Sequence, residues 1–165
     1  MGIEIHGLDS LFAKLDQLPG ALEAAATDGV NKTLQAITSD AKANVPVDTG
    51  QLRNSIEPYG EAHKATSDGA AVSGAAGTDV EHGPYVELGT GPIGEETPVD
   101  GKYPGPVSYT QNGWTYYDEK LGQFVHTRGQ PAQPYLYPAY AAHKGDLPQN
   151  IKESADKRLK KVADG

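Results

Sequence analysis

The chain of 165 residues contains no cysteine. This excludes disulfides and thiolate metal sites, and it permits assembly in a reducing cytoplasm. The sequence also lacks any run approaching the ~18 apolar residues of a membrane-spanning helix. Its first residues show no basic region followed by an apolar one, so we expect no secretory signal. The length suffices for one domain, residues 1–165, with a hydrophobic core of its own.

Positive charge is scarce. Lysine and arginine number 14 against 22 acidic residues, and the net charge is -8. This balance argues against a general nucleic-acid binder, because such proteins depend on cations that contact phosphates. Residues 57–102 are the most acidic part, with nine acidic and two basic side chains. The default interpretation of such a segment is a solvated surface, and a specific role stays open beside it.

Motifs of known chemistry are missing as well. The five histidines show no paired metal spacing, and there is no nucleophile elbow, P-loop or His-Glu-x-x-His. The stretch "GTGPIG" at 89–94 formally matches the dinucleotide-binding fingerprint. We expect Pro92 and the residues after it to open no helix, which that site requires. The sequence therefore predicts no catalytic, cofactor-binding or metal residues, and no enzyme.

Two helical patterns open the chain. Apolar residues recur at steps of three and four over 8–17 and again over 19–44. Pro19 lies between the two patterns, where it breaks the first helix or begins the second. Gly29 weakens the second helix by about 1 kcal/mol relative to alanine. The alanine-rich stripe of this helix allows close approach of a sheet or of a second subunit.

The stretch "VPVDTGQLRNSI" follows the long helical pattern. Asp48 lies three residues before Gln51, a spacing that predicts a capping box at the start of a short helical turn. The Asp-Thr-Gly resembles an aspartic-protease loop, but that chemistry needs two facing carboxylates and an all-β setting. We therefore interpret the stretch as a structural joint between helix and sheet. Its residues are Asp48, Thr49, Gly50 and Arg53.

The second half alternates turns with short elements. Pro84 and Gly89 suit the first turn and the C-cap of a short helix. Residues 92–130 form a long loop, in which 113–127 predicts a hairpin with "DEKLG" as its turn. We expect this arm to contact another subunit rather than to cover a pocket, through Trp114, Tyr116, Tyr117 and Phe124. Two further helices are predicted at 135–143 and 147–163. The basic last turns of the second complement the helix dipole or form a docking face.

Three segments together point to a family. They are "PVDTGQLRNSI" at 46–56, "YVELGTG" at 85–91 and "AQPYLYPA" at 132–139. In this order, between amphipathic terminal helices, they resemble the HK97-like neck and tail-completion proteins of tailed bacteriophages. The resemblance spans nearly the whole chain. The long 92–130 insertion departs from the pattern.

The resemblance implies a virion structural protein without catalytic residues or cofactors. Such a protein assembles as a ring, commonly of six subunits, at the head–tail joint. It would contact connector or head-completion proteins and tail-tube or tail-terminator proteins, and let DNA pass without binding it. The implied fold is α+β, with a small antiparallel β-sheet packed by a long helix and a C-terminal amphipathic helix.

An acidic wall would suit the passage of DNA, because it repels phosphates. The candidates for an acidic lumen are Glu57, Glu61, Asp68, Asp79 and Glu81. Two rival classes stay open. One is an interaction module that is not part of a virion. The other is a hydrolase that uses residues 89–130 as a lid, which a deep pocket containing paired acids with His82 or His126 would favour.

Overall fold

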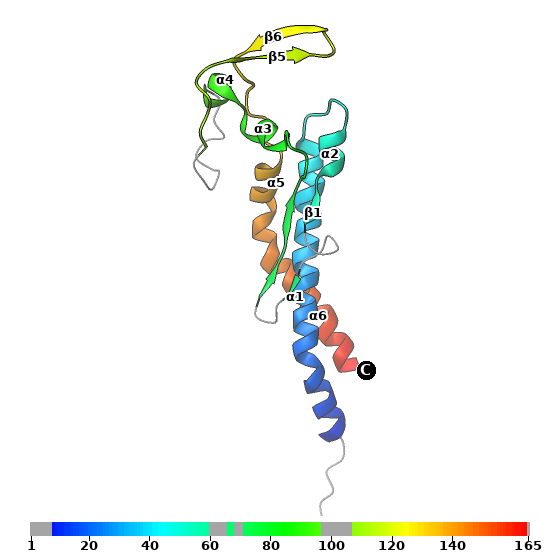
Figure 1. Ribbon diagram of the computed structural model, residues 1–165. Helices are drawn as coiled ribbons and strands as arrows, with labels where there is room; N and C mark the ends of the chain where they lie inside the picture. Colours follow the sequence, from blue (N-terminus) through cyan, green and yellow to red (C-terminus); the bar gives the residue numbers. More distant parts are fainter. Residues whose placement is uncertain (1–7, 60–65, 68–70, 97–106, 165) are drawn as a thin grey trace, which may run out of the picture. The chain divides into compact units, whose positions relative to one another are not determined.

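The computed structural model describes residues 8–59, 66, 67, 71–96 and 107–164 (Figure 1). Its helices are α1 (Leu8–Asn44), α2 (Gln51–Ser55), α3 (Gly83–Leu88), α4 (Gly91–Glu96), α5 (Leu136–His143) and α6 (Leu147–Asp164), with a 3-10 turn, η2 (Lys144–Asp146), before α6. Its strands are β1 (Glu57–Tyr59), β2 (Thr66–Ser67), β3 (Val72–Ser73), β4 (Ala75–Gly77), β5 (Trp114–Asp118) and β6 (Gln123–Thr127). The α+β prediction is confirmed.

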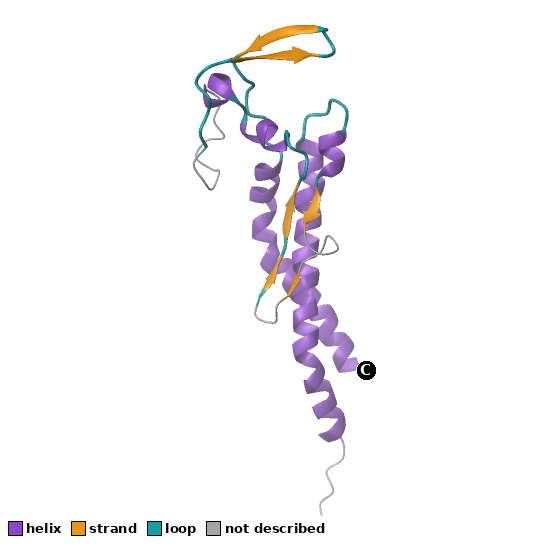
Figure 2. Cartoon of the chain, viewed as in Figure 1, coloured by secondary structure: helices purple, strands orange, loops and turns teal. Residues whose placement is uncertain are grey.

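The strands form three two-stranded sheets, coloured orange in Figure 2. β1 pairs with β4, β2 pairs antiparallel with β3, and β5 pairs antiparallel with β6. The β5–β6 sheet is the predicted hairpin, and the two helices predicted near the C-terminus are α5 and α6. No helix in the described part of the chain is long and apolar enough to span a membrane.

The chain divides into two compact units. Unit 1 comprises Met1–Ala36, Pro58–Ala76 and His143–Gly165, and unit 2 comprises Ile37–Glu57 and Gly77–Ala142. Helix α1 contributes its first part to unit 1 and its last part to unit 2. The expectation of one domain over residues 1–165 stays a prediction.

Helix α1 runs through Pro19 without a break, so the expected division into two helices is wrong. Proline removes one donor from the helix, the one that would bond the carbonyl of Leu15, and this costs about 3 kcal/mol. Two effects outweigh that loss. Residues 21–26 are mostly alanine, leucine and glutamate, which favour helix strongly. A break would also leave several more backbone groups without partners at two new helix ends.

Unit 1 is built on an antiparallel contact between α1 and α6. The Asn150 amide donates to Thr33 Oγ1 at 2.9 Å, and both side chains are buried. Two ion pairs follow on one side of this bond, Lys32–Glu153 at 2.8 Å and Arg158–Asp28 at 2.6 Å. The hydrogen bond from Lys32 is the main cause that lowers the pKa of Glu153, so this pair persists when the solution is mildly acidified.

Gly29 lies directly against Ile151 of α6. A Cβ at this position would lie 2.5 Å from Ile151 Cγ1 and 2.7 Å from the Ile151 backbone. The glycine that the sequence marks as a weak point of the helix is therefore the residue that lets α6 approach. Nearer the N-terminus of α1, a Cβ on Gly20 would have nothing within 4 Å.

The two glycines should respond oppositely to alanine. We expect Gly20→Ala to raise the free energy of unfolding by up to about 1 kcal/mol, because alanine favours helix. We expect Gly29→Ala to lower it by about 1–3 kcal/mol, because overpacking against Ile151 outweighs the same propensity gain. Urea unfolding of both variants tests this. A Gly29→Ala protein as stable as Gly20→Ala would show that α6 does not pack there.

Unit 2 holds most of the buried hydrophobic side chains in the described part of the chain. The last part of α1 contributes Ile37, Ala41 and Val45 to this core. Tyr135 and Ile56 are the largest fully buried side chains, at 2% and 0% exposure. The rest of the core is Leu52 and Ala139. This core surrounds the group described next.

Candidate functional site

A single carboxylate organises unit 2. Glu87 lies in α3 and is only 3% exposed. Its Oε2 accepts hydrogen bonds from the backbone N–H groups of Tyr135 at 2.7 Å and Leu136 at 2.8 Å. Its Oε1 accepts a third from the N–H of Tyr137 at 2.8 Å. Three charge-assisted bonds thus satisfy a buried anion whose burial would otherwise be costly.

The local sequence places both partners. Pro84 lies in the first turn of α3 and Gly89 ends the helix with φ 75°, as predicted. On the other side, Tyr135 immediately precedes α5, whose first N–H groups have no acceptor within the helix. A carboxylate at that end also favours the positive end of the helix dipole. Glu87 therefore caps α5 from a helix 48 residues earlier in the chain.

Gly83 brings a third segment to the same place. A Cβ on Gly83 would lie 2.6 Å from Thr78 Cγ2, 3.0 Å from the Tyr135 hydroxyl and 3.3 Å from Leu52 Cδ1. The hydroxyls of Ser55 and Thr78 also share a short hydrogen bond. The segments at 46–56, 85–91 and 132–139 therefore meet in one cluster, which we call the three-segment junction (Leu52, Gly83, Glu87 and Tyr135).

The "GTGPIG" stretch, residues 89–94, contacts the backbone at the base of the hairpin, and we call it the socket. Thr90 N donates to Gln130 O at 2.9 Å, and Gln130 N returns a bond to Thr90 O at 3.2 Å. Gly91 has φ 60°, and a Cβ there would lie 2.4 Å from Arg128 O. Gly129 has φ 107°, and a Cβ there would lie closer still to the Thr90 carbonyl oxygen. Glycine is needed because two backbone segments touch with no room for a side chain.

One expectation about this stretch is wrong. Residues Gly91–Glu96 do form a helix, α4, because Pro92 is tolerated in a first turn. The stretch still differs from a dinucleotide loop, since it follows the C-cap of α3 and no buried strand precedes it. Gly89 and Gly91 approach the backbone of residues 128–132 instead.

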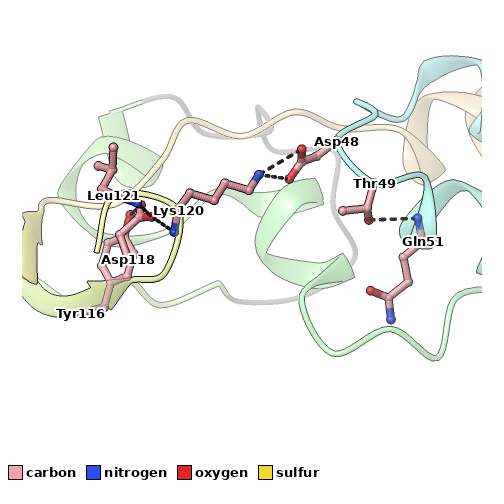
Figure 3. A network of polar contacts seen from close by, with 7 residues as sticks. All are labelled: Asp48, Thr49, Gln51, Tyr116, Asp118, Lys120 and Leu121. Atoms are coloured by element: carbon pink, nitrogen blue, oxygen red, sulfur yellow. Dashed lines mark hydrogen bonds and ion pairs between the residues drawn. The ribbon is translucent and has the colours of Figure 1, made fainter. Parts of the chain in front are cut away.

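The joint at 45–50 differs from the predicted capping box. Helix α2 begins after Gly50, which has φ 84°, and no side chain caps it. Thr49 Oγ1 accepts from Gln51 N at 3.4 Å. Asp48 instead binds Lys120 Nζ with both oxygens, at 3.0 and 3.2 Å (Figure 3). This bond is the main cause that raises the pKa of Lys120. Arg53 is exposed, and no hydrogen bond or ion pair joins it to another described residue.

The Asp48–Lys120 pair joins the joint to the tip of the hairpin. The tip itself is ordered by Asp118, whose Oδ1 accepts from the N–H groups of Lys120 at 2.9 Å and Leu121 at 3.0 Å (Figure 3). Both members of the ion pair are largely exposed, so water and salt screen it and its contribution to stability is small. The hairpin is thus attached firmly at its base and weakly at its tip.

The four aromatic candidates divide between two faces of the hairpin. The pairs Trp114↔Thr127 and Tyr116↔Val125 alternate with Thr115↔His126 and Tyr117↔Phe124, so Trp114 and Tyr116 share one face. Trp114 approaches Gly91. Tyr117 and Phe124 stack edge-to-face on the other face, with ring centroids 5.3 Å apart. They remain 53% and 76% exposed.

The acidic candidates are only partly described. Glu57, Asp79 and Glu81 are exposed. Glu61 and Asp68 lie outside the described residues. In the described ranges, no three His, Asp or Glu side chains lie close enough together to bind a metal ion.

A groove of about 640 Å³ lies beside α3 and the hairpin base. His82 lines it together with three aromatic side chains, Tyr85, Tyr109 and Trp114. No aspartate or glutamate lines this groove, and His126 is not part of it. It therefore offers His82 no carboxylate partner for the general acid–base chemistry of the hydrolase hypothesis.

Residues 9–89 match the model of a protein family described as "Bacteriophage HK97-gp10, putative tail-component". Over these residues the chain matches the HK97-gp10-like family. The match covers α1, the joint at 45–50 and α3 as far as its C-cap, and over these residues it confirms the resemblance seen in the sequence. The third segment, at 132–139, lies beyond the matched residues. The hairpin lies beyond the matched residues. No curated protein and no solved structure matches the chain.

Glu87 of this HK97-gp10-like protein is not among the residues predicted from the sequence. Its signal was a single acid within "PYVELG", flanked by apolar and aromatic residues where a surface acid is unexpected. A second signal was the proline-punctuated start of a distant helix, "QPYLYP", with no Ser, Thr, Asp or Asn to cap it. Only the fold shows that one supplies the cap of the other.

Removing the Glu87 carboxylate should destabilise the protein strongly. We expect Glu87→Ala to lower the free energy of unfolding by about 2–4 kcal/mol, because three buried N–H groups lose a charged acceptor. Glu87→Gln should lose less, since the amide oxygen still accepts. Glu119→Ala, at an exposed position in the hairpin turn, is the control. Equal urea midpoints for the Glu87→Ala and Glu119→Ala proteins would contradict this role.

Proposed function

We propose that this HK97-gp10-like tail component is a structural, non-enzymatic protein of the head–tail joint, as a neck or tail-completion protein. In this proposal it assembles as a ring, six subunits being the expected number. The ring joins the tail to the capsid connector and lets DNA pass. Its neighbours would be connector or head-completion proteins on one side and tail-tube or tail-terminator proteins on the other.

The observation that carries the proposal is the contrast within unit 2. The three-segment junction is buried and its charged group is fully hydrogen-bonded. The hairpin attached to it exposes five large apolar side chains within residues 114–124. A soluble monomer rarely exposes so many together, whereas interfaces are rich in tyrosine, tryptophan and phenylalanine. A rigid body with an apolar arm suits a subunit that is completed by its neighbours.

The chemistry of the described surface supports a role without catalysis. The groove beside α3 holds a histidine without a carboxylate. The described acids Glu57, Asp79 and Glu81 are solvent-exposed and unfit for a buried general base. They suit a surface past which DNA slides, because phosphates do not adhere to acidic walls.

Changing the outer face of the hairpin should weaken ring assembly. We expect Tyr117→Ser with Phe124→Ser to leave the melting temperature near that of the parent, because both side chains are exposed, and to shift the solution mass from ring to monomer. Val47→Ser, at an exposed valine outside the hairpin, is the control. Light scattering and negative-stain imaging give the readout. Rings that persist in the double variant would exclude this face from the interface, and a parent that stays monomeric at all concentrations would contradict the ring.

Reversing the acidic surface tests the passage of DNA. We expect particles that carry Glu57→Lys, Asp79→Lys and Glu81→Lys to assemble but to eject DNA more slowly at low salt, because the new cations hold phosphates. High salt should remove the defect. Unchanged ejection at low salt, in particles shown to contain the variant, would place these acids on an outer surface.

A further inference from the structure

The two strands of the hairpin have unprotected edges. Natural proteins usually shield an edge strand with lysine, proline or a bulge, because its free N–H and C=O groups pair with any other strand. Strands β5 and β6, "WTYYD" and "QFVHT", contain neither lysine nor proline, and they pair residue for residue without a bulge. Their only formal charge is Asp118, at the end nearest the turn.

The strands also have a composition that favours further pairing. Tryptophan, tyrosine, phenylalanine, valine and threonine make up seven of their ten residues, and these are the residues most enriched in strands. A two-stranded hairpin is marginally stable alone in water, and added strands stabilise it. The hairpin therefore gains from a third strand on either side.

The distribution of charge indicates that the added strand comes from a second copy of this chain. The chain carries a net charge of -8, so most of its surface repels a second copy. Residues 113–128 are neutral, with Asp118 and Glu119 balanced by Lys120 and Arg128. The hairpin is thus a neutral segment through which two copies of an acidic chain can approach each other. Hairpins placed side by side in the existing register would oppose Asp118 to Gln123, not to another acid.

We propose that β5 of one copy pairs antiparallel with β6 of the next copy, so that the hairpins form a continuous intersubunit sheet. This proposal rests on the ring proposed above and names its contact. β5 and β6 run in opposite directions within each hairpin. In copies related by rotation, β5 of one copy and β6 of the next are therefore also antiparallel, and strand direction alternates around the whole ring. A dimer would leave two edges unpaired, whereas a closed ring of such head-to-tail contacts leaves none. Each Tyr117 would then lie between its own Phe124 and the Phe124 of the neighbouring copy.

The absence of cysteine makes a direct test possible. Single variants Thr115→Cys and His126→Cys are prepared, unfolded, mixed and refolded, and the ring fraction is treated with a short thiol-bridging reagent. Cross-strand neighbours have Cβ atoms about 4.5–5.5 Å apart, within reach of such a reagent. We expect covalent dimers in the mixture and not in either variant alone. To allow for a shifted register, Thr115→Cys is also mixed with single cysteines at residues 123, 124, 125 and 127.

The controls separate this contact from the ring itself. Thr115→Cys mixed with Glu119→Cys, in the turn of the same hairpin, should give no dimer. Rings of normal solution mass without dimers in any β5–β6 mixture would overturn the edge pairing and leave the ring standing. Dimers in Thr115→Cys alone would show β5–β5 pairing and overturn the head-to-tail arrangement. Absence of rings in the unmodified protein would overturn the ring and, with it, this contact.

Discussion

The fold of unit 2 depends on a buried carboxylate that must be given hydrogen-bond donors. Glu87 is enclosed by the core, and it is tolerated there because the start of α5 presents three N–H groups that need an acceptor. Glu87 supplies the acceptors that these N–H groups lack, and the N–H groups supply the donors that the buried carboxylate needs. The requirement fixes α3 against Tyr135, and Gly83 at the start of α3 lies close to Thr78, Leu52 and the Tyr135 hydroxyl. Segments that lie far apart in the sequence are thereby held in one geometry.

The arm obeys a different constraint. Its base is fastened by backbone bonds between Thr90 and Gln130, and its tip rests on one exposed ion pair. The firm base determines where the hairpin starts, while the screened tip contributes little to holding it. Apolar side chains on both faces and two open strand edges remain available between these points. A structural subunit can therefore fold by itself and still carry a surface that only neighbours satisfy.

Periodicity and turn residues predicted much of the fold. The hairpin, the proline-started turn that ends at Gly89, and the two C-terminal helices all follow from local sequence. The failures have physical causes. Pro19 lies inside α1 because neighbouring residues favour helix, and α4 forms because Pro92 falls in a first turn. Asp48 binds Lys120, 72 residues away, rather than a nearby N–H. At such separations, as for Glu87 with the start of α5 and Gly29 with Ile151, the local sequence does not identify the partner.

The socket at Gly89–Gly94 has a consequence for how the arm can change. It grips the hairpin through main-chain atoms of residues 128–132 and through glycines that admit no side chain. Because these contacts involve main-chain atoms, they do not depend on which side chains the rest of the hairpin carries. Mutation can therefore change the sequences of β5 and β6 without disturbing the three-segment junction. Recombination can likewise replace the whole hairpin with another that has similar first and last residues. The hairpin is thus a part that can be exchanged, and in the proposed ring its exchange would change the specificity for neighbours while the rest of unit 2 stays the same.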